Sequence, residues 1–257
     1  MTQVTAPSGR FVWYDLMTTD LEKSIHFYSR LFGWHVKKTD MGPEVGPYHM
    51  IESDGQDIGG MVELKEEGLN SHWLGYLTVD DVDQAADAIV QQAGSVPHPP
   101  QDIPNVGRFC IAGDPGGAYF APFKFTQGQE TPEASETIPG HFCWNELHAP
   151  KAALAKCKDF YRRVIGWGGQ DEDMGPMGTY TLFKRSNGKE AAGLTTLREE
   201  GEPGYWLSYV AVANVDASVE QAKEHGAELS QDATEIPNMG TFAVLEDPVG
   251  ASFALWK

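Results

Sequence analysis

Gly9-Arg-Phe-Val-Trp13-Tyr-Asp15-Leu16 returns as Gly140-His-Phe-Cys-Trp144-Asn-Glu146-Leu147, 131 positions later in the chain. Further matches follow in the same order, mostly at a shift of 133: Phe27-Tyr28 with Phe160-Tyr161, Gly33-Trp34 with Gly166-Trp167, and Ile103-Pro-Asn-Val-Gly107 with Ile236-Pro-Asn-Met-Gly240. Ordered matches of this kind indicate an internal duplication. We therefore expect two copies of one domain, at residues 1–125 and 139–257, joined by a polar linker at residues 126–138.

The hydrophobic pattern within the first copy predicts the same short series of elements twice. Phe11 to Met17 alternates as a half-buried strand does, and Asp20 precedes apolar residues at helical spacing that end at Gly33. The remaining expected elements are strands near 48–52 and 58–64, a strand at 73–79, a helix at 82–92, and strands near 108–112 and 118–125. The pattern predicts an α+β fold built from four strand-helix-strand-strand(-strand) units.

Composition excludes several classes of protein. With 19 Lys and Arg against 37 Asp and Glu, the net charge of −18 opposes binding to nucleic acid or to anionic lipid. No apolar run reaches the roughly 18 residues that span a bilayer, so we expect a cytoplasmic protein with no membrane partner. The cysteines, Cys110, Cys143 and Cys157, show no CxxC spacing, and we expect small core residues rather than a zinc knuckle.

The repeated motifs resemble those of the vicinal oxygen chelate superfamily, which includes glyoxalase I, bleomycin resistance proteins and extradiol dioxygenases. The first copy carries the resemblance in Asp20-Leu-Glu-Lys-Ser-Ile-His-Phe-Tyr28, Val79-Asp-Asp-Val-Asp83 and Asp114-Pro-Gly-Gly117. The second copy matches at Val212-Ala-Asn-Val-Asp216 and Asp247-Pro-Val-Gly250. The resemblance implies two tandem domains, each a pair of βαβββ units that forms a cupped, mostly antiparallel sheet.

The metal enzymes of that superfamily hold a divalent ion on imidazole and carboxylate side chains from three strands. Counted from the shared motifs, the resemblance puts these ligand positions at Trp13, Leu74 and Ala121, and in the second copy at Trp144, Leu207 and Ala254. None of these side chains can bind a metal. We therefore expect no metal centre and no cofactor.

A displaced metal site in the second copy is an alternative. Glu146 and His148 lie two residues apart, so on a strand both face the same way as Trp144. The competing interpretation places His148 in a turn before Pro150, with Glu146 bonded to a backbone donor. Met17 occupies the place of His148 in the first copy and is a poor ligand for a hard metal, so the displaced site is restricted to the second copy.

Without a metal, the expected interior of each cup is aromatic, with one carboxylate per copy. Such a pocket suits a small organic molecule, because aromatic rings stack on flat or cationic ligands and a carboxylate orients them. The candidate acid-base residues are Asp15 and Glu146. The candidate ligand-binding residues are Trp13, Tyr76, Tyr119, Trp144, Tyr209 and Trp256. The same aromatic residues also suit a plain hydrophobic core.

Four functions remain open. One is a metal-dependent glyoxalase- or dioxygenase-type enzyme that uses the displaced site at Glu146 and His148. Three others need no metal, and the first of these is metal-independent binding of a small organic molecule. The second is a metal-free isomerase or lyase that uses Asp15 or Glu146, with a carboxyl pKa raised by burial, to move a proton. The third is a structural or signalling role through the surface. Since the tandem copy supplies the partner that single-domain relatives obtain by dimerising, we expect a monomer or a homodimer.

Overall fold

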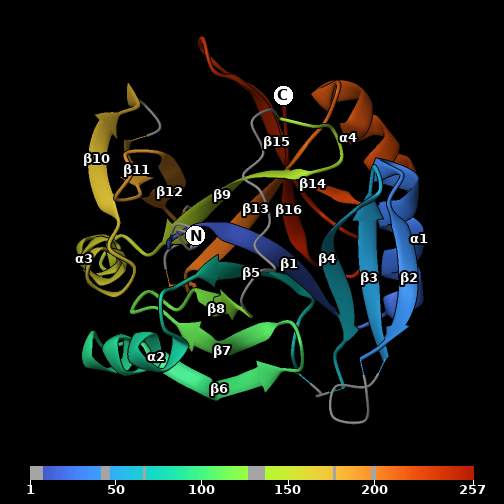
Figure 1. Cartoon of the computed structure of the whole chain (residues 1–257). Helices are drawn as coiled ribbons and strands as arrows, with labels where there is room; N and C mark the ends of the chain where they lie inside the picture. Colours follow the sequence, from blue (N-terminus) through green and yellow to red (C-terminus); the bar gives the residue numbers. More distant parts are fainter. Residues whose placement is uncertain (1–7, 42–46, 66–67, 127–136, 176–177, 198–200) are drawn as a thin grey trace. The chain divides into compact units, whose positions relative to one another are not determined.

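The computed structural model of the chain describes residues 8–41, 47–65, 68–126, 137–175, 178–197 and 201–257. Most of the expected linker therefore lies outside the described residues. The first copy contains β1 (Phe11–Thr18), α1 (Leu21–Phe32), β2 (His35–Asp40), β3 (Pro47–Ser53), β4 (Gln56–Glu63), β5 (His72–Thr78), α2 (Val82–Gln91), β6 (Ser95–Ile103), β7 (Gly107–Gly113) and β8 (Tyr119–Phe125). The second copy contains β9 (Phe142–Ala149), α3 (Leu154–Val164), β10 (Gly168–Asp173), β11 (Thr179–Lys184), β12 (Glu190–Thr196), β13 (Tyr205–Ala211), α4 (Val215–Glu224), β14 (Glu228–Ile236), β15 (Gly240–Glu246) and β16 (Ser252–Trp256). The four βαβββ units and the α+β class are confirmed (Figure 1).

Three of the helices begin at a side chain that satisfies their first free backbone N–H groups. Asp20 accepts from the Lys23 amide at the start of α1, Asp81 caps α2 in the same way, and Asn214 caps α4. Gly33 ends α1 in the left-handed conformation, with φ of 71°. These caps explain why the sequence predicted the helix boundaries well.

Each copy forms one mixed sheet of eight strands. The strand order is β2-β3-β4-β1-β5-β8-β7-β6 in the first sheet and β10-β11-β12-β9-β13-β16-β15-β14 in the second. In the first sheet β1 and β4 are parallel, as are β5 and β8, whereas the hairpins β2-β3-β4 and β6-β7-β8 are antiparallel. In each copy, the first strands of its two units are neighbours at the centre of the sheet.

The pattern missed the edge strands β2 and β6. Both are mostly exposed, so they lack the apolar alternation by which a strand is recognised. Strand β6 also contains Pro97, Pro99 and Pro100, which have no backbone N–H to donate. Proline is tolerated at a sheet edge, and the register of β6 against β7 shifts twice along this strand.

The chain packs into two compact units, and each draws on both copies. One unit comprises the described residues within Met1–Val12, Gly75–Glu133 and Asn145–Trp206, and we call it the α2–α3 unit. The other comprises those within Trp13–Leu74, Ala134–Trp144 and Leu207–Lys257, and we call it the α1–α4 unit. In the first, Phe120 packs against Tyr161 with ring centroids 5.5 Å apart. In the second, Tyr28 packs against Phe253 at 5.7 Å.

Each unit contains a buried chain of polar contacts between the two copies. In the α2–α3 unit, the Trp206 indole donates to Tyr161 Oη at 2.9 Å, and Tyr161 Oη donates to Asp114 at 3.2 Å. In the α1–α4 unit, the Trp73 indole donates to Tyr28 Oη at 3.0 Å. There, burial and the nearby charge of Asp247 raise the pKa of Tyr28. Burial also raises the pKa of Asp247, although Asp247 Oδ2 has no hydrogen bond of ordinary geometry to the described residues. The aspartates open the repeated Asp-Pro-x-Gly turns.

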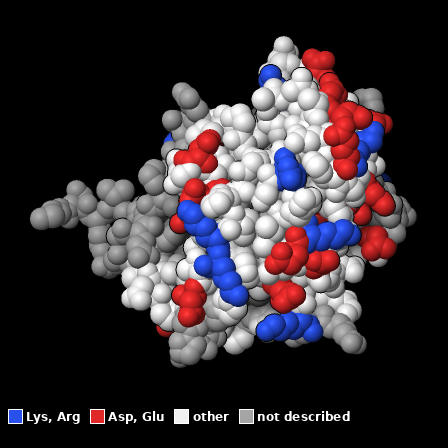
Figure 2. Space-filling view, turned by 90° about the vertical axis from the view of Figure 1, so that its right-hand side faces the viewer, with Lys and Arg blue, Asp and Glu red and all other residues white. Residues whose placement is uncertain are grey.

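Acidic and basic side chains are interspersed among uncharged residues on the face in Figure 2. Burial raises the pKa of Cys110, Cys143 and Cys157 to about 12 in each case, so their thiols are not ionised at neutral pH. No helix within the described residues is long and apolar enough to cross a membrane.

Removing the Tyr161 hydroxyl should destabilise the fold. Tyr161→Phe leaves the buried Trp206 indole without its acceptor and removes a donor from Asp114, so we expect a loss of about 1–3 kcal/mol in the free energy of unfolding. Urea unfolding followed by tryptophan fluorescence measures it. Tyr119→Phe is the matched control, because Tyr119 is 50% exposed. Equal stability of the two variants would contradict the role of this network.

The buried aspartates should make stability depend on pH. Desolvation by burial raises the pKa of Asp114, so the folded chain binds this proton more tightly than the unfolded chain does. The stability gained from this tighter proton binding is fully present below about pH 4, the ordinary aspartate pKa. It is lost as the pH rises through the raised pKa of Asp114. The difference in stability between the natural chain and Asp114→Asn should therefore shift in favour of the variant as pH rises. A pH-independent difference would contradict this assignment.

Candidate functional site

Asp15 is the buried carboxylate of the first sheet, with 5% of its surface exposed. Tyr48 on β3 donates its hydroxyl to Asp15 Oδ1. The Trp13 indole N–H lies 3.1 Å from the same oxygen and 2.8 Å from Tyr48 Oη. Trp13 and Asp15 therefore share one face of β1, as the alternation predicts, and two neutral donors offset the cost of burying the carboxylate. We call these three residues the Asp15 cluster.

A glycine on the neighbouring strand makes room for Tyr48. Gly60 on β4 is the register partner of Asp15, and a Cβ added there would collide with the Tyr48 hydroxyl and ring. The second sheet repeats the arrangement. Gly193 on β12 is the register partner of Glu146, and a Cβ there would collide with the hydroxyl of Tyr180. Sequence reasoning missed both tyrosines, although they recur at a shift of 132 and the glycines at 133.

The second copy carries a different polar cluster. Strand β9 includes both Glu146 and His148, so the interpretation that placed His148 in a turn is wrong. His148 Nε2 lies 2.8 Å from Glu146 Oε1, at an angle too bent for an ordinary hydrogen bond. The imidazole also stacks on the Tyr205 ring, with centroids 4.8 Å apart and planes 4° from parallel. We call Glu146, His148 and Tyr205 the Glu146 cluster.

The other candidate residues, apart from Tyr119, lie in aromatic groups. In the α2–α3 unit, Tyr76 is buried with its ring centroid 5.8 Å from both Phe109 and Phe123. In the α1–α4 unit, Tyr209 contacts Phe242 and Trp256, and Trp144 packs against the same group. Tyr119 begins β8 and is half exposed.

The expected metal positions do not fit a metal centre. Leu74, Ala121, Leu207 and Ala254 are buried apolar residues, and the Trp13 indole offers only an N–H donor. Within the described ranges, no group of three or more His, Cys, Asp or Glu side chains could hold a metal ion. Glu146 and His148 contact each other, but no third His, Cys, Asp or Glu among the described residues joins them to complete a displaced site.

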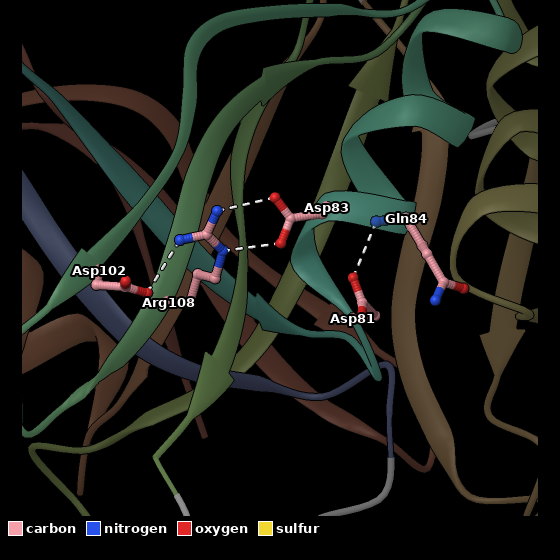
Figure 3. A network of polar contacts seen from close by, with 5 residues as sticks. All are labelled: Asp81, Asp83, Gln84, Asp102 and Arg108. Carbon is pink, nitrogen blue, oxygen red and sulfur yellow. Dashed lines mark hydrogen bonds and ion pairs between the residues drawn. The ribbon is translucent and has the colours of Figure 1, made fainter.

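A separate polar network surrounds Arg108 on β7. Its guanidinium donates to both oxygens of Asp83 at 2.8 Å and to Asp102 at 3.0 Å (Figure 3). These hydrogen bonds lower the pKa of Asp83, so the charges are paired at neutral pH. Arg108 therefore holds α2 and the β6–β7 hairpin together, and we assign it no ligand.

Known proteins are similar to this chain in sequence or in fold. Residues 10–121 match the sequence model of the "Glyoxalase/Bleomycin resistance protein/Dioxygenase superfamily", and residues 148–256 match that of a "Glyoxalase-like domain". The chain is 32% identical over 248 residues to "Putative glyoxylase CFP32" of Mycobacterium bovis. The match covers 95% of this chain and 93% of the relative. It is 27% identical over 264 residues to "Anthracycline biosynthesis protein DnrV" of Streptomyces peucetius, over 96% and 92%. The Mn(II)-bound glyoxalase from Novosphingobium aromaticivorans has the same fold, with a TM-score of 0.65 at 15% identity, over 97% of this chain and 82% of that one.

Filling the space beneath Tyr48 should separate it from Asp15. Gly60→Ala puts a methyl group where the Tyr48 ring lies, so the ring must move and the carboxylate loses a donor. We expect a loss of about 1–3 kcal/mol in stability, measured by urea unfolding. Gly68→Ala is the control for the added methyl group, because a Cβ there meets no atom within 4 Å, although its φ of 89° carries its own cost. If Gly60→Ala unfolds no more readily than Gly68→Ala, Tyr48 does not depend on that space.

Proposed function

This chain belongs to the glyoxalase/bleomycin resistance protein/dioxygenase superfamily, with two glyoxalase-like domains in tandem, and from that premise we propose that it binds a small planar organic molecule without a metal ion. The Asp15 cluster carries this proposal. It puts a buried carboxylate beside a tryptophan and a tyrosine, on the strand where metal enzymes of the family are expected to place a ligand.

Electrostatics favours a flat ligand that carries positive charge or a hydrogen-bond donor. A carboxylate kept away from water attracts a cation or donor more strongly than one in bulk solvent. The indole and phenol rings add stacking surface and cation–π attraction. Trp13 is only partly buried, so its ring retains surface for contact with a ligand.

The names of two relatives agree with a planar aromatic ligand. DnrV of Streptomyces peucetius and DauV of Streptomyces sp. strain C5 are both named anthracycline biosynthesis proteins. Anthracyclines are built on a flat fused-ring system. We extend only this shared chemistry, a planar polycyclic ligand, to the present chain.

Asp15 should select a cationic ligand over a neutral one. We expect Asp15→Asn to weaken binding of proflavine, a planar aromatic cation, at least about tenfold, because a charge-assisted contact contributes about 1.5–3 kcal/mol. Binding of 1,4-dihydroxyanthraquinone, which is planar and neutral, should change much less. Titration calorimetry measures both affinities, with and without EDTA.

Asp87→Asn is the control for loss of one negative charge, because Asp87 is exposed on α2. Tyr48→Phe keeps the Asp15 carboxylate and removes one of its donors, so it tests the cluster should Asp15→Asn fail to fold. The proposal fails if the natural chain binds neither probe. It also fails if EDTA abolishes the binding.

A further inference from the structure

Helices α1 and α4 pack against each other in the α1–α4 unit, and each contributes one imidazole to their contact (Figure 1). His26 lies on α1 in the first copy, and His225 caps the C-terminal end of α4 in the second. Their ring centroids are 6.3 Å apart. His26 is exposed and His225 is partly exposed, so solvent reaches this histidine pair.

The two helices run antiparallel at this contact. The Gln221 side chain donates to the carbonyl oxygen of Arg30 at 2.8 Å. His225 follows Gln221 by four residues on α4. His26 likewise precedes Arg30 by four on α1, so the histidine pair lies about one helical turn along the same contact. Lys23, three residues before His26, also donates to a backbone carbonyl oxygen of the second copy, at 2.8 Å. Hydrogen bonds between the copies therefore flank the pair.

The other unit packs the equivalent helices without histidine. At the shift of 133, Asp159 on α3 takes the place of His26, and Gln92 takes the place of His225. Asp159 forms ion pairs with Arg162 and Arg163 of its own helix. Since α2 and α3 pack together with these residues, helix packing alone does not explain two imidazoles between α1 and α4.

We propose that His26 and His225 together bind a transition-metal dication such as Zn²⁺, Ni²⁺ or Cu²⁺. Imidazole nitrogen is a preferred ligand of these ions, whereas Mg²⁺ and Ca²⁺ prefer oxygen. Two side chains supply part of the coordination shell, and water supplies the rest. A site of two ligands agrees with the finding that no group of three His, Cys, Asp or Glu side chains gathers in the part of the chain that the structure describes.

The spacing of the two rings suits one shared ion. Zn–N bonds of about 2.0–2.1 Å in a tetrahedral site hold two imidazole ring centres roughly 5 Å apart, about 1 Å closer than the present pair. The rings of His26 and His225 meet edge to face, with planes at 89°. Because His26 is exposed, a change of its side-chain rotamer can turn a ring nitrogen toward the ion.

An ion held by both histidines links α1 of the first copy to α4 of the second. It binds only where the two helices are packed, so it stabilises the folded chain by linkage. A metal clip between residues far apart in sequence also closes a long loop, which costs the unfolded chain much of its freedom. Two protein ligands hold an ion less tightly than the three or four of a catalytic or structural centre, and we expect gel filtration to remove it.

Melting temperatures of the full-length chain in ZnCl₂, NiCl₂ and MgCl₂ test the proposal. Zinc and nickel should raise the melting temperature, and magnesium should not. His26→Gln and His225→Gln should each weaken zinc binding at least about tenfold in calorimetry, because loss of even an outer-shell partner of a metal ligand costs 10–100-fold. His225→Gln reproduces the residue of the equivalent helix end. His98→Gln is the matched control, because His98 is exposed on β6.

Nuclear magnetic resonance with ¹⁵N-labelled histidine locates the ion. The proposal is supported if one equivalent of zinc shifts the ring-nitrogen signals of His26 and His225 together. It is overturned if either single variant keeps the zinc affinity of the natural chain, or if His98→Gln loses as much. Sedimentation in zinc that shows two chains bridged by the ion also overturns it. Binding of planar probes at the Asp15 cluster is measured in EDTA as well, so none of these results decides the proposed function.

Discussion

The two-residue alternation of β1 and β9 is the constraint on which the rest of the structure depends. Leu16 and Leu147 are fully buried on one face, and their burial fixes which residues emerge on the other. Trp13 and Asp15 follow on β1, and Trp144, Glu146 and His148 on β9. A slip of one residue would turn the carboxylates into the apolar core at a prohibitive cost in desolvation.

Duplication explains how one scaffold supports two different clusters. Tyr48 over Gly60 and Tyr180 over Gly193 repeat the same close packing beside the two carboxylates. The buried Trp73–Tyr28 and Trp206–Tyr161 contacts repeat as well. Against this shared background the differences stand out. Trp13 and Tyr48 donate to the carboxylate of the first sheet, and the imidazole of His148 lies 2.8 Å from the carboxylate of the second.

Local signals in the sequence predicted much of the fold. Asp20 and Gly33 mark the ends of α1, because capping requires those residue types. The exposed edge strand β2 and the proline-rich β6 gave no such signal, since neither has an apolar face. The mixing of the copies into two packed units was also beyond a reading of local patterns. It depends on contacts such as Tyr161 with Asp114, which are 47 residues apart.

The candidate site was predicted only in part. The alternation placed Trp13 beside Asp15, and Glu146 beside His148. It did not predict Tyr48 or Tyr205. These tyrosines lie on other strands and come close to the clusters only when the strands have paired and packed. Tyr119, expected with the ligand-binding residues, is half exposed at the start of β8. Long-range pairing is the information that a single sequence lacks.

Native mass spectrometry combined with elemental analysis tests the central claim most directly, on protein purified without chelators. A chain whose ligand positions are tryptophan, leucine and alanine should carry no stoichiometric divalent ion after gel filtration. One equivalent of zinc, manganese, nickel or iron per chain, retained by the natural protein and lost from Glu146→Gln or His148→Gln, would contradict the account.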